Sequence, residues 1–138
     1  MKSDNKFEAL TMIGRNGLYR PDKPHLVLSH EFLFNSYLGM LTGIFDEGYS
    51  WTDAVKGELL DPHSTGICND MIYITIKNNK VTIDSQPDMD NSPEDNAIEI
   101  NRQILLAIIN KWNELDAKGY QQITFTRHED GSITLTGK

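Results

Sequence analysis

The stretch from Asp88 to Glu99 carries the oxygen-bearing side chains that a calcium loop would need. On the twelve positions of an EF-hand loop, positions 1, 3, 5, 9 and 12 are Asp88, Asp90, Ser92, Asn96 and Glu99. Position 6, however, is Pro93, and proline cannot adopt the positive φ that this loop demands of its glycine. We therefore expect no EF-hand, because the same residues fit the start of a helix.

The histidines and the single cysteine do not form a metal or catalytic motif. The histidines are His25, His30, His63 and His128. No two of them have the i, i+4 spacing of a helical metal site, and His63 with Cys68 offers only two ligands in one loop. Nothing pairs Cys68 or a serine with a base and an orienting acid, as nucleophilic catalysis requires. We expect histidines that are structural or exposed, and a protein that is not an enzyme and has no metal or cofactor.

A pair of glycines near the amino end matches one nucleic-acid motif. Gly14-Arg15-Asn16-Gly17 has the GXXG pattern of a KH loop. That loop lies between two helices, whereas Leu18-Tyr19-Arg20-Pro21, which follows here, breaks a helix. We expect a surface turn, and the composition of the whole segment from Gly14 to Pro24 indicates a loop.

Charge is distributed very unevenly along the chain. The 138 residues have a formal net charge of −7, but the segment from Leu26 to Asn101 holds thirteen acids and three bases. Between Val81 and Asn101 there are six acids and no base. Such a patch repels phosphate backbones and attracts basic partners, so we expect a basic protein partner and no direct contact with nucleic acid. A solvated face that promotes solubility explains the same charges equally well.

Length and composition fit one soluble globular domain, residues 1–138. The longest apolar stretch, Phe32 to Phe45, is shorter than the about 20 residues of a membrane span. Met1 to Leu10 lacks the apolar core of a secretory signal. These features predict a cytoplasmic protein without a membrane partner.

Apolar periodicity predicts three helices. The first follows Ser29 as N-cap and ends near Gly48, and the second opens with Ser50 and Asp53 as a capping box and ends at Asp61-Pro62. The third is predicted from Pro93 to Lys118, with Ser92 as its N-cap and acids in its first turn. Its apolar stripe consists of Ala97, Ile100, Ile104, Ile108, Trp112 and Leu115.

Alternating side chains predict two β-hairpins, one on each side of the third helix. The first joins Met71–Lys77 to Lys80–Ser85 through Asn78-Asn79, and the second joins Gln121–Arg127 to a strand around Ile133 and Leu135. We expect an α+β fold in which the two hairpins form one antiparallel sheet. The long helix of the C-terminal half would pack on one face through Ile104, Ile108 and Trp112, and a threonine-lined face would look outward. The other predicted helices would come from the N-terminal half.

Two stretches resemble immunity proteins of bacterial polymorphic toxins, in particular those of contact-dependent growth inhibition systems. They are Met71-Ile-Tyr-Ile-Thr-Ile-Lys-Asn-Asn-Lys-Val-Thr-Ile-Asp84 and Ile104 through Leu135, which includes Lys111-Trp112-Asn-Glu-Leu115 and Gly131-Ser-Ile-Thr-Leu135. The resemblance implies a small inhibitor that binds a cognate toxin domain tightly, often a ribonuclease, and occludes its active site. It assigns no functional residue, because these families share no binding motif that can be placed on this sequence.

Physical reasoning adds where such a partner would bind. The active site of a ribonuclease must accept a polyanion, so an acidic inhibitor gains fast association and complementarity there. The acids that we expect to bind the partner are Asp84, Asp88, Asp90, Glu94, Asp95, Glu99, Asp46, Glu47 and Asp53. Two alternatives remain open: a small hydrolase that uses carboxylates near Asp88, and a structural subunit that dimerises through the threonine-lined face.

Overall fold

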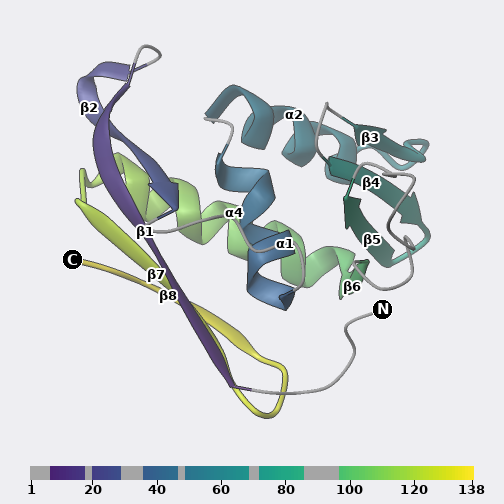
Figure 1. Ribbon diagram of the computed structural model, residues 1–138. Helices are drawn as coiled ribbons and strands as arrows, with labels where there is room; N and C mark the ends of the chain where they lie inside the picture. Colours follow the sequence, from purple (N-terminus) through teal and green to yellow (C-terminus); the bar gives the residue numbers. More distant parts are fainter. Residues whose placement is uncertain (1–6, 18–19, 29–35, 47–48, 69–71, 86–96) are drawn as a thin grey trace.

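Two antiparallel sheets enclose three helices in the fold. The computed structural model describes residues 7–17, 20–28, 36–46, 49–68, 72–85 and 97–138, and describes 14–17, 20–28, 46, 49–50 and 85 by their backbone only. In this part of the chain the helices lie between a sheet with strand order β2-β1-β7-β8 and a sheet with order β3-β4-β5-β6 (Figure 1). We call these sheet A and sheet B. The α+β class predicted from the sequence is therefore confirmed.

The strands of sheet A are β1 (Glu8–Gly17), β2 (Arg20–Leu28), β7 (Gln122–Arg127) and β8 (Ile133–Gly137). Those of sheet B are β3 (Gly66–Cys68), β4 (Ile72–Lys77), β5 (Lys80–Ser85) and β6 (Ile98–Asn101). The helices are α1 (Tyr37–Asp46), α2 (Tyr49–Leu60) and α4 (Arg102–Ala117).

Both predicted hairpins are confirmed, but they belong to different sheets. Strands β4 and β5 meet at Asn78-Asn79, where Asn78 has a positive φ of 57°, and β7 pairs with β8. The prediction of one shared sheet is wrong, because β7 pairs with β1 and β5 pairs with β6. Periodicity within a strand indicates which face is apolar, and carries no information about which distant strand will be its neighbour.

The predicted loop from Gly14 to Pro24 is also wrong. Its described residues belong to a long antiparallel hairpin in which Gly14 pairs with Leu26 and Asn16 with Pro24, and the register shifts between Asn16 and Gly17. Strand β2 lies at the edge of sheet A, and edge strands are where sheets tolerate proline. The GXXG residues are therefore the end of strand β1, and not a surface turn.

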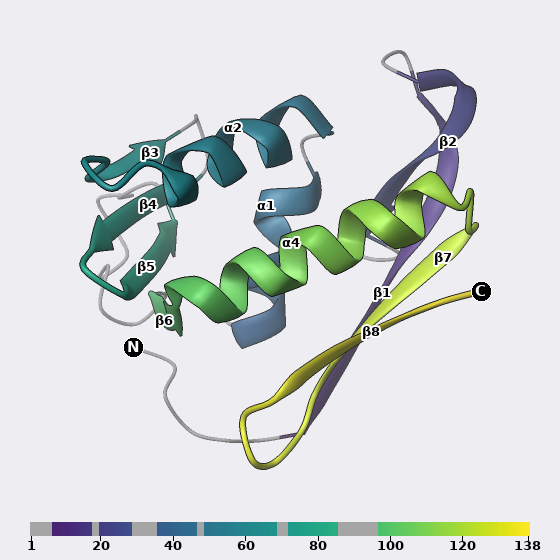
Figure 2. The same ribbon diagram turned by 180° about the vertical axis from the view of Figure 1, so that it is seen from behind.

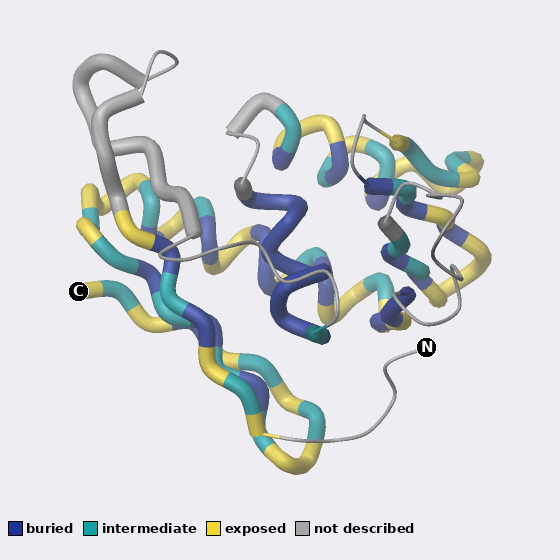
Figure 3. Tube along the Cα trace, in the orientation of Figure 1, coloured by how far each residue is buried: buried dark blue, intermediate teal, exposed yellow. Residues whose placement is uncertain are grey.

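Helix α1 is the centre of the core. Every residue from Tyr37 to Phe45 is buried, and the helix contacts β1 and β2 on one side and β5 and β6 on the other (Figure 3). Its one buried polar side chain, Thr42, donates a 2.8 Å hydrogen bond to the Leu38 carbonyl. The Ser36 hydroxyl accepts a hydrogen bond from the Gly39 amide at the helix start, whereas the predicted limits Ser29 and Gly48 lie outside the described residues.

Helix α2 covers one end of α1 and packs on β3. It ends at Leu60, directly before Asp61-Pro62, as the sequence predicts. The predicted capping box is wrong, because the helix already begins at Tyr49 and Ser50 lies within its first turn.

Helix α4 begins later than the sequence predicts. Residues 98–101 form strand β6, and the helix starts at Arg102 with Asn101 as N-cap, whose side chain accepts from the amides of Gln103 and Ile104. The predicted cap residues 92–96 lie outside the described part of the chain. The helix spans the molecule from β6 to sheet A (Figure 2) and ends before Lys118-Gly119, as predicted.

The predicted core positions of α4 are confirmed except for one. Ile108 and Trp112 are buried, but 52% of Ile104 is exposed. Trp112 contacts Phe45 of α1 and Phe125 of β7, with ring centroids 4.7 and 5.9 Å apart. Three aromatic side chains from different elements therefore join α1, α4 and sheet A.

Arg102 joins the ends of three elements. Its Nε donates a 2.7 Å hydrogen bond to the Leu59 carbonyl, and its two terminal nitrogens donate to the carbonyls of Asp61 and Asn78. The last carbonyls of a helix lack partners within the helix and carry partial negative charge, so a guanidinium satisfies both needs. The start of α4 is thereby held to the end of α2 and to the β4–β5 turn.

No helix in the described residues is long and apolar enough to cross a membrane.

Two matched substitutions in α4 test this packing. Ile108→Ala should lower the free energy of unfolding by about 2–5 kcal/mol, because it leaves a cavity in the core. Ile104→Ala removes the same atoms from an exposed position and should change it by less than about 0.5 kcal/mol. Urea denaturation of both variants measures the difference, and equal effects would contradict the orientation of α4.

Candidate functional site

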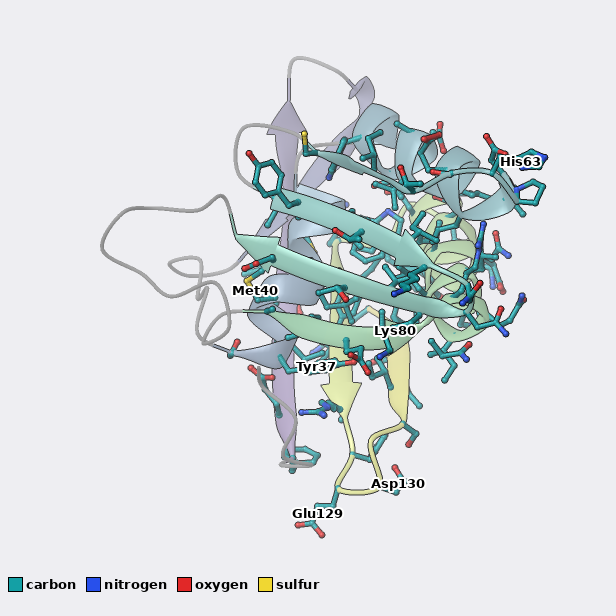
Figure 4. All side chains as sticks on the ribbon, turned by 90° about the vertical axis from the view of Figure 1, so that its right-hand side faces the viewer. Tyr37, Met40, His63, Lys80, Glu129 and Asp130 are labelled. Atoms are coloured by element: carbon teal, nitrogen blue, oxygen red, sulfur yellow. The ribbon has the colours of Figure 1, made fainter. Side chains whose placement is uncertain are left out.

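Among the described residues, the outer face of sheet B carries polar side chains that are exposed or half-buried. Strands β4, β5 and β6 bury alternate residues against the helices and direct the others to solvent. The side chains of this outer face are Cys68, Tyr73, Thr75, Lys77, Lys80, Thr82, Asp84, Glu99 and Asn101. Figure 4 shows this face of the sheet, with Lys80 labelled. The apolar side chains on the other side anchor the sheet, so the outer face is rigidly supported.

Two acids predicted to bind a partner come together on this face. Thr82 pairs with Glu99, and Asp84 is two residues further along β5 on the same side, which makes Asp84 and Glu99 diagonal neighbours. Asp84 is half-buried and lies directly across from Tyr73, which in turn pairs with Cys68. An aromatic ring beside one carboxylate, with a second carboxylate on the next strand, is a combination that suits binding to a basic protein surface.

The opposite end of the same face is basic. Lys77 and Lys80 pair across the hairpin end, and the Lys80 ammonium is 3.4 Å from a carboxylate oxygen of Glu99. An open groove of about 530 Å³ lies here, lined by Lys77, Asn78, Asn79, Lys80, Glu99, Ile100 and Asn101. Both partners of the ion pair are well exposed, so it stabilises the fold by no more than about 1 kcal/mol. We call the end of this face that carries Asp84 and Glu99 its acidic half, and the end that carries Lys77 and Lys80 its basic half.

The remaining predicted partner-binding acids are not brought to this surface by the described residues. Asp53 is exposed on α2, and Asp46 is the last residue of α1, described by its backbone only. Four acids between Asp84 and Glu99 and one after α1 lie outside the described residues: Asp88, Asp90, Glu94, Asp95 and Glu47.

A buried polar cluster that the sequence analysis missed positions this face. Arg127 is 6% exposed and its guanidinium lies 3.7 Å from the ring centre of Tyr37, a cation–π contact. Directly across from Arg127 in the sheet is Glu8, whose carboxylate accepts a 2.8 Å hydrogen bond from the Leu38 amide at the start of α1. Arg127 follows Ile123 and Phe125 on the buried side of β7, and this register was the signal in the sequence.

Tyr37 extends the cluster to sheet B. Its hydroxyl donates a 3.2 Å hydrogen bond to the backbone carbonyl of Glu99. Burial raises the pKa of Tyr37 above its usual 10.0, although the Arg127 charge opposes this shift. Near neutral pH the phenol keeps its proton, so it cannot act as a base. The cluster therefore positions β6, and with it Glu99, relative to sheet A.

The described histidines do not join a catalytic arrangement. His63 is exposed, and His128 lies 3.1 Å from the Thr134 hydroxyl on the outside of sheet A. His25 is described by its backbone only and His30 lies outside the described residues. Among the described residues, no three His, Cys, Asp or Glu side chains lie close enough to hold a metal ion together.

Comparisons with protein-family models, with curated proteins and with solved structures gave no match.

Removing the Tyr37 hydroxyl should weaken the fold in a pH-dependent way. Tyr37→Phe loses one part-buried hydrogen bond, which corresponds to about 1 kcal/mol of unfolding free energy at pH 7. Because the folded-state pKa of Tyr37 is raised, the unfolded chain releases this proton first as the pH increases. The advantage of the wild type is thus complete below about pH 10 and shrinks above it.

Urea denaturation of wild type and Tyr37→Phe between neutral and alkaline pH measures this difference. Tyr73→Phe, on the outer face of sheet B, is the matched control and should change the stability by less than about 0.5 kcal/mol. A difference between wild type and Tyr37→Phe that grows with pH would show that Tyr37 is not buried as described.

Proposed function

We propose that this chain is a bacterial immunity protein that works in the cytoplasm. It binds a cognate toxin domain through the acidic half of the outer face of sheet B and occludes the active site of the toxin. The resemblance of two stretches to such proteins supports the class of function. Asp84 and Glu99 are diagonal neighbours on the outer face of sheet B, and this observation carries the choice of surface.

The charge of this surface fits an enzyme that acts on nucleic acid. The cleft of a ribonuclease is basic because it must bind phosphates. Carboxylates of an inhibitor that bind at the rim of this cleft imitate the negative charge of the phosphates. In the sequence, four further acids connect Asp84 to Glu99, and no base interrupts them. An acidic surface of this kind increases the rate of encounter and disfavours partners of like charge.

Rigidity of the surface adds to the affinity. The inner residues of β4, β5 and β6 are buried isoleucines and a valine, and the Glu99 backbone is tied to Tyr37. A partner that binds this sheet does not have to order it, so little conformational entropy is lost on binding. Tyr73 offers an aromatic contact near the two acids, as the centres of tight interfaces often do.

The proposal requires a toxin gene beside the gene for this chain, and binding kinetics with the toxin domain that it encodes test the choice of surface. Asp84→Asn with Glu99→Gln should lower the association rate by about 3- to 10-fold at low salt and weaken its dependence on ionic strength. If either carboxylate is desolvated against a toxin lysine or arginine, dissociation should also accelerate, corresponding to about 2–5 kcal/mol.

The matched control removes the same charge elsewhere. Glu114→Gln with Glu129→Gln neutralises two exposed acids on α4 and the β7–β8 turn, and should leave both rate constants within about twofold of wild type. Equal effects of the two double variants would show that only net charge matters. No binding to the toxin domain, with no protection of cells that express it, would refute the immunity function itself.

A further inference from the structure

Among the described residues, strand β8 is an edge of sheet A with which no further strand pairs. Sheet A ends with β8, which pairs only with β7 among the described strands. In the β7–β8 ladder, Gln122 and Lys138 exchange backbone hydrogen bonds, and the His128 amide donates to the Ser132 carbonyl. In an antiparallel ladder such pairs recur at every second residue, so the N–H and C=O groups of Ile133, Leu135 and Gly137 are directed away from β7.

The other sheet edges carry features that discourage pairing, and β8 does not. Strand β2 contains Pro21 and Pro24 with charged residues between them, and β3 and β6 are only three and four residues long. The five residues of β8, Ile-Thr-Leu-Thr-Gly, include no charge and no proline. Soluble proteins rarely leave such an edge open, because it is a template for another strand.

We propose that β8 pairs with β8 of a second copy of this chain, antiparallel and centred on Leu135, to give one continuous eight-stranded sheet. This register satisfies the outward backbone groups of all three positions, because Ile133 faces Gly137 of the second copy and Leu135 faces Leu135. The large side chain of Ile133 thus lies opposite a glycine, which has no side chain. Gly137 already packs closely against Tyr120, so the incoming Ile133 completes an apolar contact there.

The same register continues the threonine rows of sheet A. On its outer face Thr11, Thr124 and Thr136 are cross-strand neighbours, and the hydroxyls of Thr11 and Thr124 are 2.9 Å apart. In the dimer Thr136 lies opposite Thr134 of the second copy, so each row crosses the interface without interruption. This arrangement uses the edge of the sheet and leaves its threonine-lined face exposed.

Charges at the ends of β8 fit the same arrangement. Lys138 comes opposite Ser132 of the second copy, and the Asp130 carboxylate accepts hydrogen bonds from the amide and hydroxyl of its own Ser132. A lysine therefore meets an aspartate at both ends of the interface. This self-complementarity favours a second copy over a foreign strand as the occupant.

The expected dimer is weak and reversible. Its contact is one short strand per copy, well below the area of a standard stable interface, so we expect a dissociation constant in the micromolar range. The outer face of sheet B lies on the other side of the helices and stays free in both copies. The dimer is therefore independent of the proposed immunity function, and each copy could still bind a partner.

Sedimentation of the full chain over about a hundredfold concentration range tests the proposal. The wild type should change from monomer to dimer. Thr134→Lys with Thr136→Lys places like charges opposite each other twice and should raise the dissociation constant about 10-fold or more. Thr134→Lys with Thr136→Glu places opposite charges there, so its dissociation constant should stay within about threefold of wild type.

The two double variants change the same exposed positions, so a general loss of folding affects both, and melting temperatures at low concentration verify this. Amide exchange at Ile133 and Leu135 should slow as the concentration of wild type increases. A wild type that stays monomeric, or two variants that associate equally, would overturn the proposal. Protection of β8 by the toxin domain alone would assign the edge to a foreign strand and refute pairing with a second copy.

Discussion

Helix α1 has no polar side, and the rest of the structure depends on covering it. A surface helix needs one apolar stripe, but here all nine residues from Tyr37 to Phe45 are buried. Burial of each large apolar side chain stabilises the fold by about 1.5–3 kcal/mol, so exposing either side of α1 to water would be strongly destabilising. One sheet can cover only one side. The chain therefore builds two sheets, and each has one face on the helices and one face open to solvent.

The polar groups at the start of α1 connect these two sheets. The first amides of a helix need acceptors, and Glu8 of sheet A supplies one to Leu38. Tyr37 then reaches the Glu99 backbone in sheet B while Arg127 covers its ring. The orientation of the acidic face is thus fixed from the opposite sheet, through a helix whose own sequence contains no charge before Asp46.

Local pattern was enough to predict strands β4, β5, β7 and β8 and the buried positions of the long helix, and it failed where distant pairing decides. Asn78-Asn79 identified a hairpin because its residues tolerate the backbone of a tight turn, and the buried positions Ile108 and Trp112 followed from helical spacing. Ile100 fits the same helical spacing, yet it lies in strand β6 and pairs with Val81 of β5, because Ile98 and Ile100 alternate with polar residues. The glycines and prolines between Gly14 and Pro24 likewise predicted a loop where the structure has the β1–β2 hairpin. Within the candidate site, Asp84 and Glu99 were foreseen, whereas their meeting on one face needed the pairing of β5 with β6.

The single cysteine provides the most direct test of the proposed binding surface. Cys68 is exposed and lies across from Tyr73, in the same cross-strand row as Asp84. Its rate of reaction with a maleimide can be measured on the native chain, free and bound to the toxin domain. A control carrying Cys68→Ser with Glu129→Cys moves the thiol to the exposed β7–β8 turn and should react equally in both states. If the acidic half of sheet B is the interface, the toxin domain should slow the reaction of Cys68 about 10-fold or more. An unchanged rate in a fully formed complex would contradict it.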